Sequence, residues 1–599
     1  PKGYLNSLRR KAPRSGFYLV VEKILARHET LREDWPVEGT TGYEFTNLVL
    51  GLLIDPAGEE GCTRAYAEFA GETRSFAQIV REAKLGIMEN EMASELNVLA
   101  RDAGRVARQN PRTADFTRNI LHRALREVVA SFPVYRTYLD MEGRPSEADR
   151  RDLDWAIAQA RRNETSLDPS VFDFVHRLLS GDLVAEPRSG FSRSAVLRCA
   201  MKLQQYSGPV MAKGLEDTAY YRYNRFVGLN EVGGQPDTFG VSLAAFHRAN
   251  RQRAERWPHA MLATATHDTK RGEDARARLA VLSEMPEGWA RHVQTWSRLL
   301  RARRGDLEGA APPDRNDEYL LYQLLIGTWP MELLDESLDG EALGLYAERI
   351  KGTMIKSLRE AKIHSTWAAP DASYEEATVS FAADALDPSR AGNFLASFLP
   401  FVARVARLGM RNTLVQTVLK LTAPGMPDIY QGTELWDFSM VDPDNRRPVD
   451  YALRARLLEE VTAELASYRR DAMRRYAASW RDARGKLAII VTILDHRRDH
   501  AALFKEGGYE PLEAEGPNAD QICAFLRRHN GEAIMTVAGR FPARLETEGL
   551  APNTLLPLPE ALRGTRWRDI LCGIEHDADA ALSVPDLLTT LPAAVLVPV

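Results

Sequence analysis

The feature that most constrains the fold is a series of short apolar runs set among long helical segments. Such runs lie at residues 17–25 (FYLVVEKIL), 132–139, 259–268 and 421–434. Between them, apolar residues recur at the three- and four-residue spacing of amphipathic helices. Apolar strands that alternate with helices predict an α/β barrel or open sheet built on parallel strands.

A (β/α)8 barrel needs eight core strands, and these runs supply only about half of them. The chain begins with Pro1 rather than Met, and its opening PKGYLNSLRRKAP has neither an apolar signal core nor a presequence pattern. If the fold is a (β/α)8 barrel, we therefore expect its second half, with large helical insertions, the first half being encoded before residue 1.

The pattern changes near residue 485. Short apolar runs such as LAIIVTIL (487–494), EAIMTVAG and AAVLVPV are then separated by Gly, Pro and Asp, which predicts a C-terminal antiparallel β-sandwich. The resulting division is a strand-five region at 1–60, a strand-six region with a helical insertion at 61–258, a strand-seven and strand-eight region with a second insertion at 259–484, and a β domain at 485–599.

Charge and cysteine content narrow the class of protein. Lys and Arg (78) nearly balance Asp and Glu (83), for a net charge of −5, whereas a nucleic-acid or anionic-membrane binder needs a basic excess. The four cysteines form no CxxC pair, so neither a disulfide scaffold nor a zinc site is expected. No apolar run approaches the roughly 18 residues of a membrane span. We expect a cytoplasmic protein that binds neither nucleic acid nor membrane.

Two acidic residues end predicted core strands. Glu22 interrupts an apolar run, where an unpaired charge is costly, and Asp268 lies in the polar cluster THDTKRGED, 266–274. In a barrel, strand ends carry the active site. The competing interpretation is that each residue is a helix cap or a surface ion-pair partner, and neither position decides the matter alone.

The same cluster contains His267, Lys270 and Arg271. His267 fits a hydrogen-bonded core histidine equally well, and the two basic residues fit the first turn of a helix. Cations at a helix N-terminus oppose the macrodipole, however, so local stability does not favour them there. An anionic or polyhydroxylated ligand is the expected reason for their presence.

The segment 211–226 (MAKGLEDTAYYRYNRF) concentrates flat rings and charged groups, among them Lys213 and Tyr220. Rings that stack on sugar C–H faces and charged groups that bind hydroxyls suit a carbohydrate site. The same mixture suits a protein interface, and composition does not separate the two. The loop 434–451 has the same character.

Several strings carry a resemblance to a known family. FYLVVEKIL, TATHD and PGMPDIYQGTE are similar to the strand-five, strand-seven and strand-eight motifs of the α-amylase superfamily. GTTGYEFTNLV, FPVYRTY, MAKGLEDTAYYRYNR, THDTKRGEDARARL and ELWDFSMVDPDNRRPVDY are more specific and resemble the maltooligosyltrehalose synthases, the glucosylmutase branch of that superfamily. The likeness runs through the whole chain in consistent order.

The resemblance implies roles for individual residues. Glu22 matches the general acid/base, Asp268 the carboxylate that holds the sugar hydroxyls, and His267 a histidine that binds a hydroxyl of the reacting glucose. Asp442 and Arg446, in the string DPDNR, match a pair that contacts the neighbouring glucose. The residues assigned to the reducing-end subsites are Lys213, Tyr220, Lys270 and Arg271.

The resemblance also implies a reaction. A retaining enzyme of this family would turn the reducing-end α-1,4 linkage of a maltooligosaccharide into an α,α-1,1 linkage. Its nucleophilic Asp is expected before residue 1, so the chain alone is expected to be inactive. The alternatives are an α-amylase-like hydrolase and a catalytically silent glucan-binding polypeptide. No metal or organic cofactor is implied, and the expected functional partner is a maltooligosyltrehalose trehalohydrolase.

Overall fold

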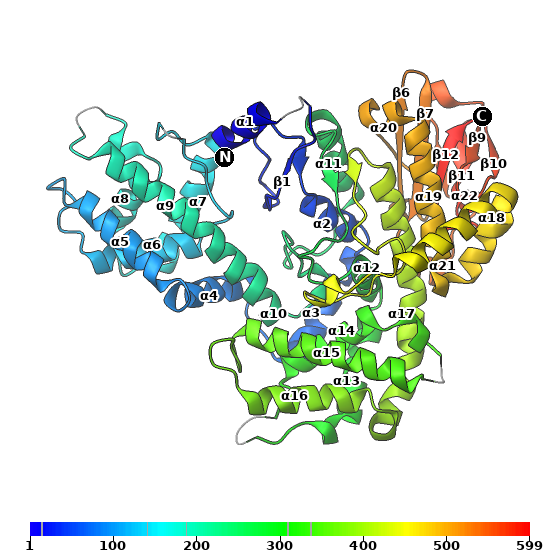
Figure 1. Cartoon of the computed structure of the whole chain (residues 1–599), viewed down its shortest axis with the longest axis horizontal. Helices are drawn as coiled ribbons and strands as arrows, with labels where there is room; N and C mark the ends of the chain where they lie inside the picture. The colour runs from blue at the N-terminus through cyan, green and yellow to red at the C-terminus, as the bar shows by residue number, and fades with distance from the viewer. Residues whose placement is uncertain (13–15, 141, 187–188, 308–310, 336–337) are drawn as a thin grey trace.

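The computed structural model describes residues 1–12, 16–140, 142–186, 189–307, 311–335 and 338–599. Most of the chain is helical, and the chain ends in a mainly antiparallel sheet (Figure 1). In this view one helical lobe lies at the left, a second at the bottom and the C-terminal sheet at the upper right, around a centre with short parallel strands.

The centre begins with four two-residue strands, β1 (Val20–Val21), β2 (Gly39–Thr40), β3 (Met261–Leu262) and β4 (Met426–Pro427). β1 pairs in parallel with β2, and β3 pairs in parallel with β4. β2 lies against β3, because a Cβ on Gly39 would come within 2.5 Å of the Ala260 Cβ. The two parallel pairs therefore lie close together, with Gly39 of β2 against Ala260, the residue before β3.

Helices pack around these strands. The helices of this central part are α1 (Lys2–Lys11), α2 (Tyr43–Leu52), α3 (Glu59–Ala70), the π-helix η3 (Ala212–Ala219), α10 (Tyr220–Arg222), α11 (Leu243–Arg256) and α12 (Glu273–Val281), of which α2 contacts β3. Every residue of α12 is buried, so this helix runs through the core directly behind the polar cluster that follows β3.

The left-hand lobe has its own apolar core. Its helices are α4 (Phe76–Glu89), α5 (Ala93–Ala107), α6 (Arg118–Ala130), α7 (Glu147–Asn163), α8 (Pro169–Leu179) and α9 (Arg193–Met211). α4 begins at a capping box in which Ser75 and Gln78 exchange hydrogen bonds, a local signal that fixes helix starts. α9 continues into η3, so this lobe is joined to the centre through the segment 211–226.

The remaining long helices are grouped around the helix α17. Its members are α13 (Pro286–Leu299), α14 (Arg315–Thr328), α15 (Gly340–Ala361), α16 (Ala372–Ala385), α17 (Pro388–Thr422), α18 (Tyr451–Ala478), α19 (Arg484–Asp499) and α20 (Ala501–Glu506). Short 3₁₀ turns lie at Pro56–Gly58, Asp182–Val184, Val227–Leu229, Leu282–Glu284, Arg301–Arg303, Met331–Leu333, Asp444–Arg446, Trp480–Asp482, Ala519–Gln521 and Glu560–Leu562.

The C-terminal module contains a six-stranded antiparallel sheet in the order β10-β9-β12-β7-β6-β5 and the separate pair β11-β8. The strands are β5 (Glu510–Leu512), β6 (Ile522–His529), β7 (Glu532–Gly539), β8 (Leu555–Pro557), β9 (Thr565–Asp569), β10 (Glu575–Ala578), β11 (Ala581–Ser583) and β12 (Ala593–Pro598). Two short helices, α21 (Pro542–Glu548) and α22 (Val584–Leu587), complete it. One face of the sheet packs on α17, and a separate apolar cluster lies within the module.

Some predicted strands are wrong. Residues 132–139 form no strand: the carbonyls of Phe132 and Tyr135 accept hydrogen bonds from the Lys84 and Ser207 side chains instead of from a neighbouring strand. The strand expected within 61–258 is absent from the described part of that range, and β2 is the parallel strand next to β1. No strand was expected at the position of β2.

The run 487–494 is also not a strand, because it lies within α19. An eight-residue apolar run has no periodicity that separates a buried strand from a buried helix. Here α17 and α18 pack against it, so most of its apolar side chains are buried in the helical conformation. The C-terminal sheet consequently starts at β5 rather than near residue 485.

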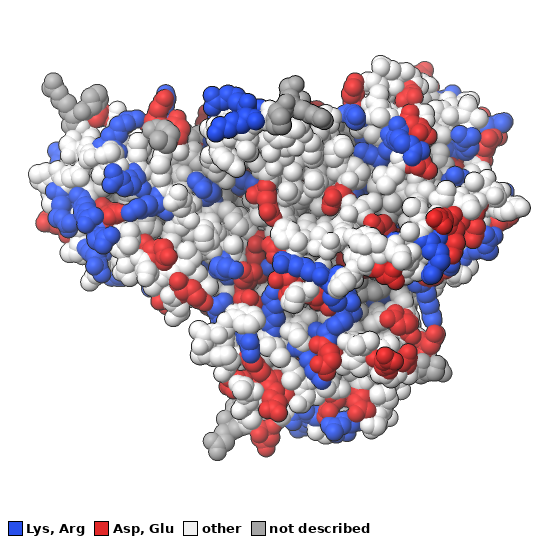
Figure 2. All heavy atoms as spheres, in the orientation of Figure 1, with Lys and Arg blue, Asp and Glu red and all other residues white. Residues whose placement is uncertain are grey.

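Figure 2 shows Lys and Arg interspersed with Asp and Glu over the visible face rather than gathered in one basic patch. Among the described helices, none combines the length and apolar character that crossing a bilayer requires.

Candidate active site

Three predicted residues, Glu22, His267 and Asp268, meet at the carboxyl ends of β1 and β3. The Tyr43 hydroxyl donates a hydrogen bond to Glu22 Oε1 (3.3 Å), and the Thr266 hydroxyl donates to the Tyr43 oxygen (3.1 Å). The Asp268 backbone N–H donates to the same Thr266 hydroxyl (3.1 Å), and His267 Nε2 lies 4.0 Å from Glu22 Oε1. Two strand ends more than two hundred residues apart thus share one hydrogen-bond chain through Tyr43.

These three side chains remain open to solvent. Their exposed fractions are 55% for Glu22, 57% for His267 and 40% for Asp268. Burial raises the pKa of the Tyr43 phenol well above its ordinary value, so Tyr43 acts as a hydrogen-bond donor to Glu22. A ligand on this face can therefore approach both carboxylates while the Tyr43 hydroxyl stays hydrogen-bonded to Glu22.

The loop that carries Asp442 and Arg446 lies directly beside this group. Arg446 donates to the His267 carbonyl oxygen (3.3 Å), and Asn445 Nδ2 donates to the same oxygen (3.1 Å). The Lys356 ammonium donates to Asp442 Oδ1 (2.6 Å), and this bond helps to hold the pKa of Asp442 below its ordinary value despite partial burial. The structure therefore brings Asp442 and Arg446 to the same face as His267.

Two lysines of the predicted site meet on one carboxylate. Lys213 Nζ lies 2.6 Å from Asp217 Oδ2, and Lys270 Nζ lies 3.1 Å from Asp217 Oδ1 and 3.8 Å from Asp268 Oδ1. The Lys270 side chain is only 5% exposed. Burial opposes its charge, but Tyr221, Asp217, Asp268 and Glu216 around it outweigh burial and raise the pKa of Lys270. Lys270 is thus an ammonium ion beside Asp268.

Tyr220 and Arg271 lie beneath the open face. The Tyr220 hydroxyl donates to the Gly234 carbonyl (2.8 Å), and the Arg271 guanidinium donates to the Asn230 carbonyl (3.2 Å). Both side chains are buried. The structure brings these two residues under the site but does not bring them to its surface.

Comparison with known proteins decides the family. No protein-family profile matches the chain. A putative maltooligosyl trehalose synthase of Mycobacterium tuberculosis (strain H37Rv) is 33% identical over 599 residues, which are all of this chain and 67% of the relative. The chain belongs to the maltooligosyltrehalose synthase family.

Solved structures of the family agree. The maltooligosyltrehalose synthase of Arthrobacter ramosus matches all of this chain at 33% identity with a TM-score of 0.81, over 68% of its own length. A DSM5389 glycosyltrehalose synthase matches all of it at 29% identity with a TM-score of 0.72, over 66% of its own length. The resemblance to the maltooligosyltrehalose synthases is therefore confirmed at the level of sequence and of fold.

Sequence reasoning missed three residues of this site, Tyr43, Glu216 and Asp217. Tyr43 lies in GTTGYEFTNLV, a string specific to the maltooligosyltrehalose synthases, but it was given no role. Burial raises the pKa of Glu216 to about 7, and its carboxyl accepts hydrogen bonds from the Tyr135 hydroxyl and the Gly233 N–H. The signal that could have found Glu216 and Asp217 is their place between Lys213 and Tyr220.

A cavity of about 440 Å³ lies elsewhere, between α2, α11 and the segment 25–31. Its lining includes none of the nine predicted site residues. The volume of a cavity therefore does not locate the candidate site, because Glu22 and Asp268 lie on an open face and not in this cavity.

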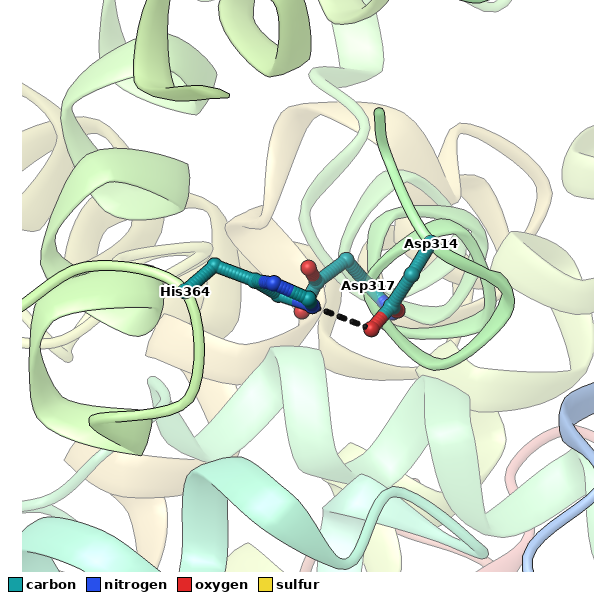
Figure 3. Close-up of side chains that lie close together, drawn as sticks. All are labelled: Asp314, Asp317 and His364. Atoms are coloured by element: carbon teal, nitrogen blue, oxygen red, sulfur yellow. Dashed lines mark hydrogen bonds and ion pairs between the residues drawn. The ribbon is translucent and has the colours of Figure 1, made fainter. Parts of the chain in front are cut away.

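Within the described residues, one group of side chains has the composition and spacing of a metal site: Asp314, Asp317 and His364, whose donor atoms lie within 4.8 Å of one another (Figure 3). Their polar atoms already have partners. His364 Nε2 lies 2.8 Å from Asp314 Oδ2, the Asp317 N–H donates to Asp314 Oδ1 (2.8 Å), and the Tyr374 hydroxyl donates to Asp317 Oδ2 (2.9 Å). These bonds tie α14 to α16 and to the segment after α15.

Proposed function

We propose that this chain carries the acid/base side of an active site that converts the reducing-end α-1,4 linkage of a maltooligosaccharide into an α,α-1,1 linkage. The observation that carries the proposal is the convergence of Glu22, His267 and Asp268 on one open face in a maltooligosyltrehalose synthase family member. The enzyme class is an intramolecular transferase, and the net reaction is an isomerisation.

Glu22 would act first as an acid and then as a base. A retaining glycosidic reaction needs a nucleophilic carboxylate and a proton donor about 5 to 5.5 Å apart. In the first step the C1–O bond breaks, the nucleophile bonds to C1, and the Glu22 proton goes to the leaving oxygen. In the second step the released glucose turns, its anomeric hydroxyl attacks C1, the bond from C1 to the nucleophile breaks and frees that carboxylate, and Glu22 takes the proton of the attacking hydroxyl. Tyr43 supports this role by fixing the carboxyl of Glu22.

The other residues would bind sugar hydroxyls. Asp268 and His267 would hold the reacting glucose, and Asp442 with Arg446 would contact the next glucose on the non-reducing side. Lys213 and Lys270 would serve the reducing-end subsites, where water must be excluded while the glucose turns. We assign Tyr220 and Arg271 to the support beneath these subsites, since both are buried on backbone carbonyls.

The barrel assignment belongs to the same proposal. β1 to β4 would be strands five to eight of a (β/α)8 barrel. This is supported by the parallel pairs β1–β2 and β3–β4, by the close approach of Gly39 to Ala260, and by the site residues that follow β1 and β3. In the division into 1–60, 61–258, 259–484 and 485–599, the first region would then carry strands five and six, β1 and β2, and 61–258 would be the helical insertion, without a strand in its described part. We also propose a cytoplasmic location and a trehalohydrolase that consumes the product.

The test measures products rather than substrate loss. Maltopentaose would be incubated with residues 1–599 and with a chain extended by the segment that carries the expected nucleophile. Loss of reducing ends without free glucose would support isomerisation in the extended chain. A rise in reducing ends would indicate an α-amylase-like hydrolase, and binding without any turnover in both chains would indicate a silent glucan-binding polypeptide.

A further inference from the structure

We propose that Asp217, on the π-helix η3, is a positioning residue that holds the Lys270 ammonium at a fixed distance from Asp268. The inference rests on the proposed function, because it concerns how Asp268 is kept available for sugar. Nothing in the sequence pattern assigns Asp217 a role: it stands in the run 211–226, which also contains four other charged residues.

The contacts of Asp217 define what it can do. Its two carboxylate oxygens are divided between two ammonium groups, Lys213 at 2.6 Å and Lys270 at 3.1 Å. Asp268 lies farther from Lys270, at 3.8 Å, which is an ion-pair distance rather than a hydrogen bond. Asp217 therefore takes the short bond to Lys270, and Asp268 keeps its own hydrogen-bonding capacity.

The two lysines differ in how much they need Asp217. The Lys213 side chain is 61% exposed, so water can replace Asp217 as its partner. Lys270 is almost fully buried, and a buried charge that loses its partner is destabilised by several kcal/mol. Without the Asp217 charge, Lys270 still has Asp268 as an ion-pair partner, at 3.8 Å.

η3 is fixed in a way that suits this role. The Tyr220 N–H donates to the Leu215 carbonyl, the i to i−5 bond of a π-helix, which places an extra residue in the turn. Glu216 binds the Tyr135 hydroxyl and the Gly233 N–H, and a Cβ on Gly214 would come within 2.7 Å of the Lys84 Cγ. η3 is thus packed on α4 and bonded to two loops, so Asp217 is presented from a rigid support.

The experiment compares Asp217→Asn, which keeps the shape and removes the charge, with Asp217→Glu, which keeps the charge. Asp102→Asn is the matched control, since Asp102 also pairs with a lysine of the α9 segment, Lys202, but lies away from the site. A crystal structure of Asp217→Asn is expected to show Lys270 Nζ within about 3.2 Å of Asp268.

Two further measurements separate positioning from folding. The first is the rate at which acetic anhydride labels Lys270, measured by mass spectrometry relative to the rate for Lys356. This rate is expected to rise in Asp217→Asn, about tenfold for each unit by which the pKa of Lys270 falls. Maltopentaose binding is expected to weaken about tenfold to a hundredfold in Asp217→Asn. Asp217→Glu is expected to weaken binding less, and Asp102→Asn is expected to bind as the unsubstituted chain does.

Each outcome decides one of the two proposals. If the unsubstituted chain binds no maltopentaose, the proposed function fails, and the crystal structure and the labelling rate still decide the role of Asp217. If Lys270 keeps its position and its labelling rate in Asp217→Asn, or if sugar binding equals that of Asp102→Asn, the positioning role is overturned.

Discussion

Two groups in this molecule have nearly the same composition, a histidine with two carboxyl groups, and different hydrogen bonding. In the open group, Glu22, His267 and Asp268, the side chains are about half exposed, and His267 lies 4.0 Å from Glu22 without a hydrogen bond. In the closed group, Asp314, Asp317 and His364, the side chains bond to one another and to Tyr374. A group whose members satisfy each other stabilises the fold, and a group with unused hydrogen-bonding capacity is available to a ligand.

The first prediction breaks the open group. Glu22→Gln is expected to lower the conversion of maltopentaose by about 10² to 10⁴-fold, because the proton donor is lost while the shape is kept. The measurement is the initial rate in the extended chain, with the thermal melting temperature as the control for folding. A rate close to that of the unsubstituted chain would remove Glu22 from the mechanism.

The second prediction tests a binding residue of the same group. His267→Ala is expected to raise the KM for maltopentaose and lower kcat/KM by about tenfold to a hundredfold, since one hydroxyl contact is lost and no proton donor is removed. The melting temperature is expected to stay unchanged because the ring is exposed. A large loss of stability would show that His267 supports the fold instead.

The third prediction breaks the closed group. His364→Ala is expected to destabilise the protein by about 1 to 3 kcal/mol, because it leaves Asp314 without a charge-assisted hydrogen bond. Sugar binding is expected to remain at the level of the unsubstituted chain. Thermal denaturation and maltopentaose binding measure the two effects, and a change in binding without a change in stability would reverse the assignment.

The last prediction concerns the pH dependence of stability. Burial, with the nearby Asp314 charge, raises the pKa of Asp317 to about 7, above the roughly 3.9 of an unfolded Asp. The folded state then holds a proton that the unfolded state has lost, so this group's contribution to stability is full below about pH 4 and is lost as pH rises toward 7. Asp317→Asn is expected to remove up to about 1.4 kcal/mol per pH unit of that slope. The measurement is urea denaturation at several pH values. If the free energy of unfolding of Asp317→Asn has the same slope against pH as that of the unsubstituted chain, the assignment is wrong.

The open group could be predicted from the sequence because its carboxylates are marked by short-range sequence patterns. Glu22 and Asp268 each end a short apolar run, and parallel strands bring such ends to one edge. The closed group could not be predicted in this way. Asp314 caps α14, whereas His364 and Tyr374 come from segments about fifty to sixty residues later, and their meeting depends on how three helices pack.

The sequence by itself determined the family and the residues that follow β1 and β3, since these depend on strings and short-range pattern. Only the tertiary structure decided how much of each run is strand: two residues of 17–25 are paired as β1, and 487–494 became part of α19. It also decided that Tyr220 and Arg271 are buried while Glu22 and His267 are open. The physical reason is that pairing and burial depend on neighbours that come from distant parts of the chain.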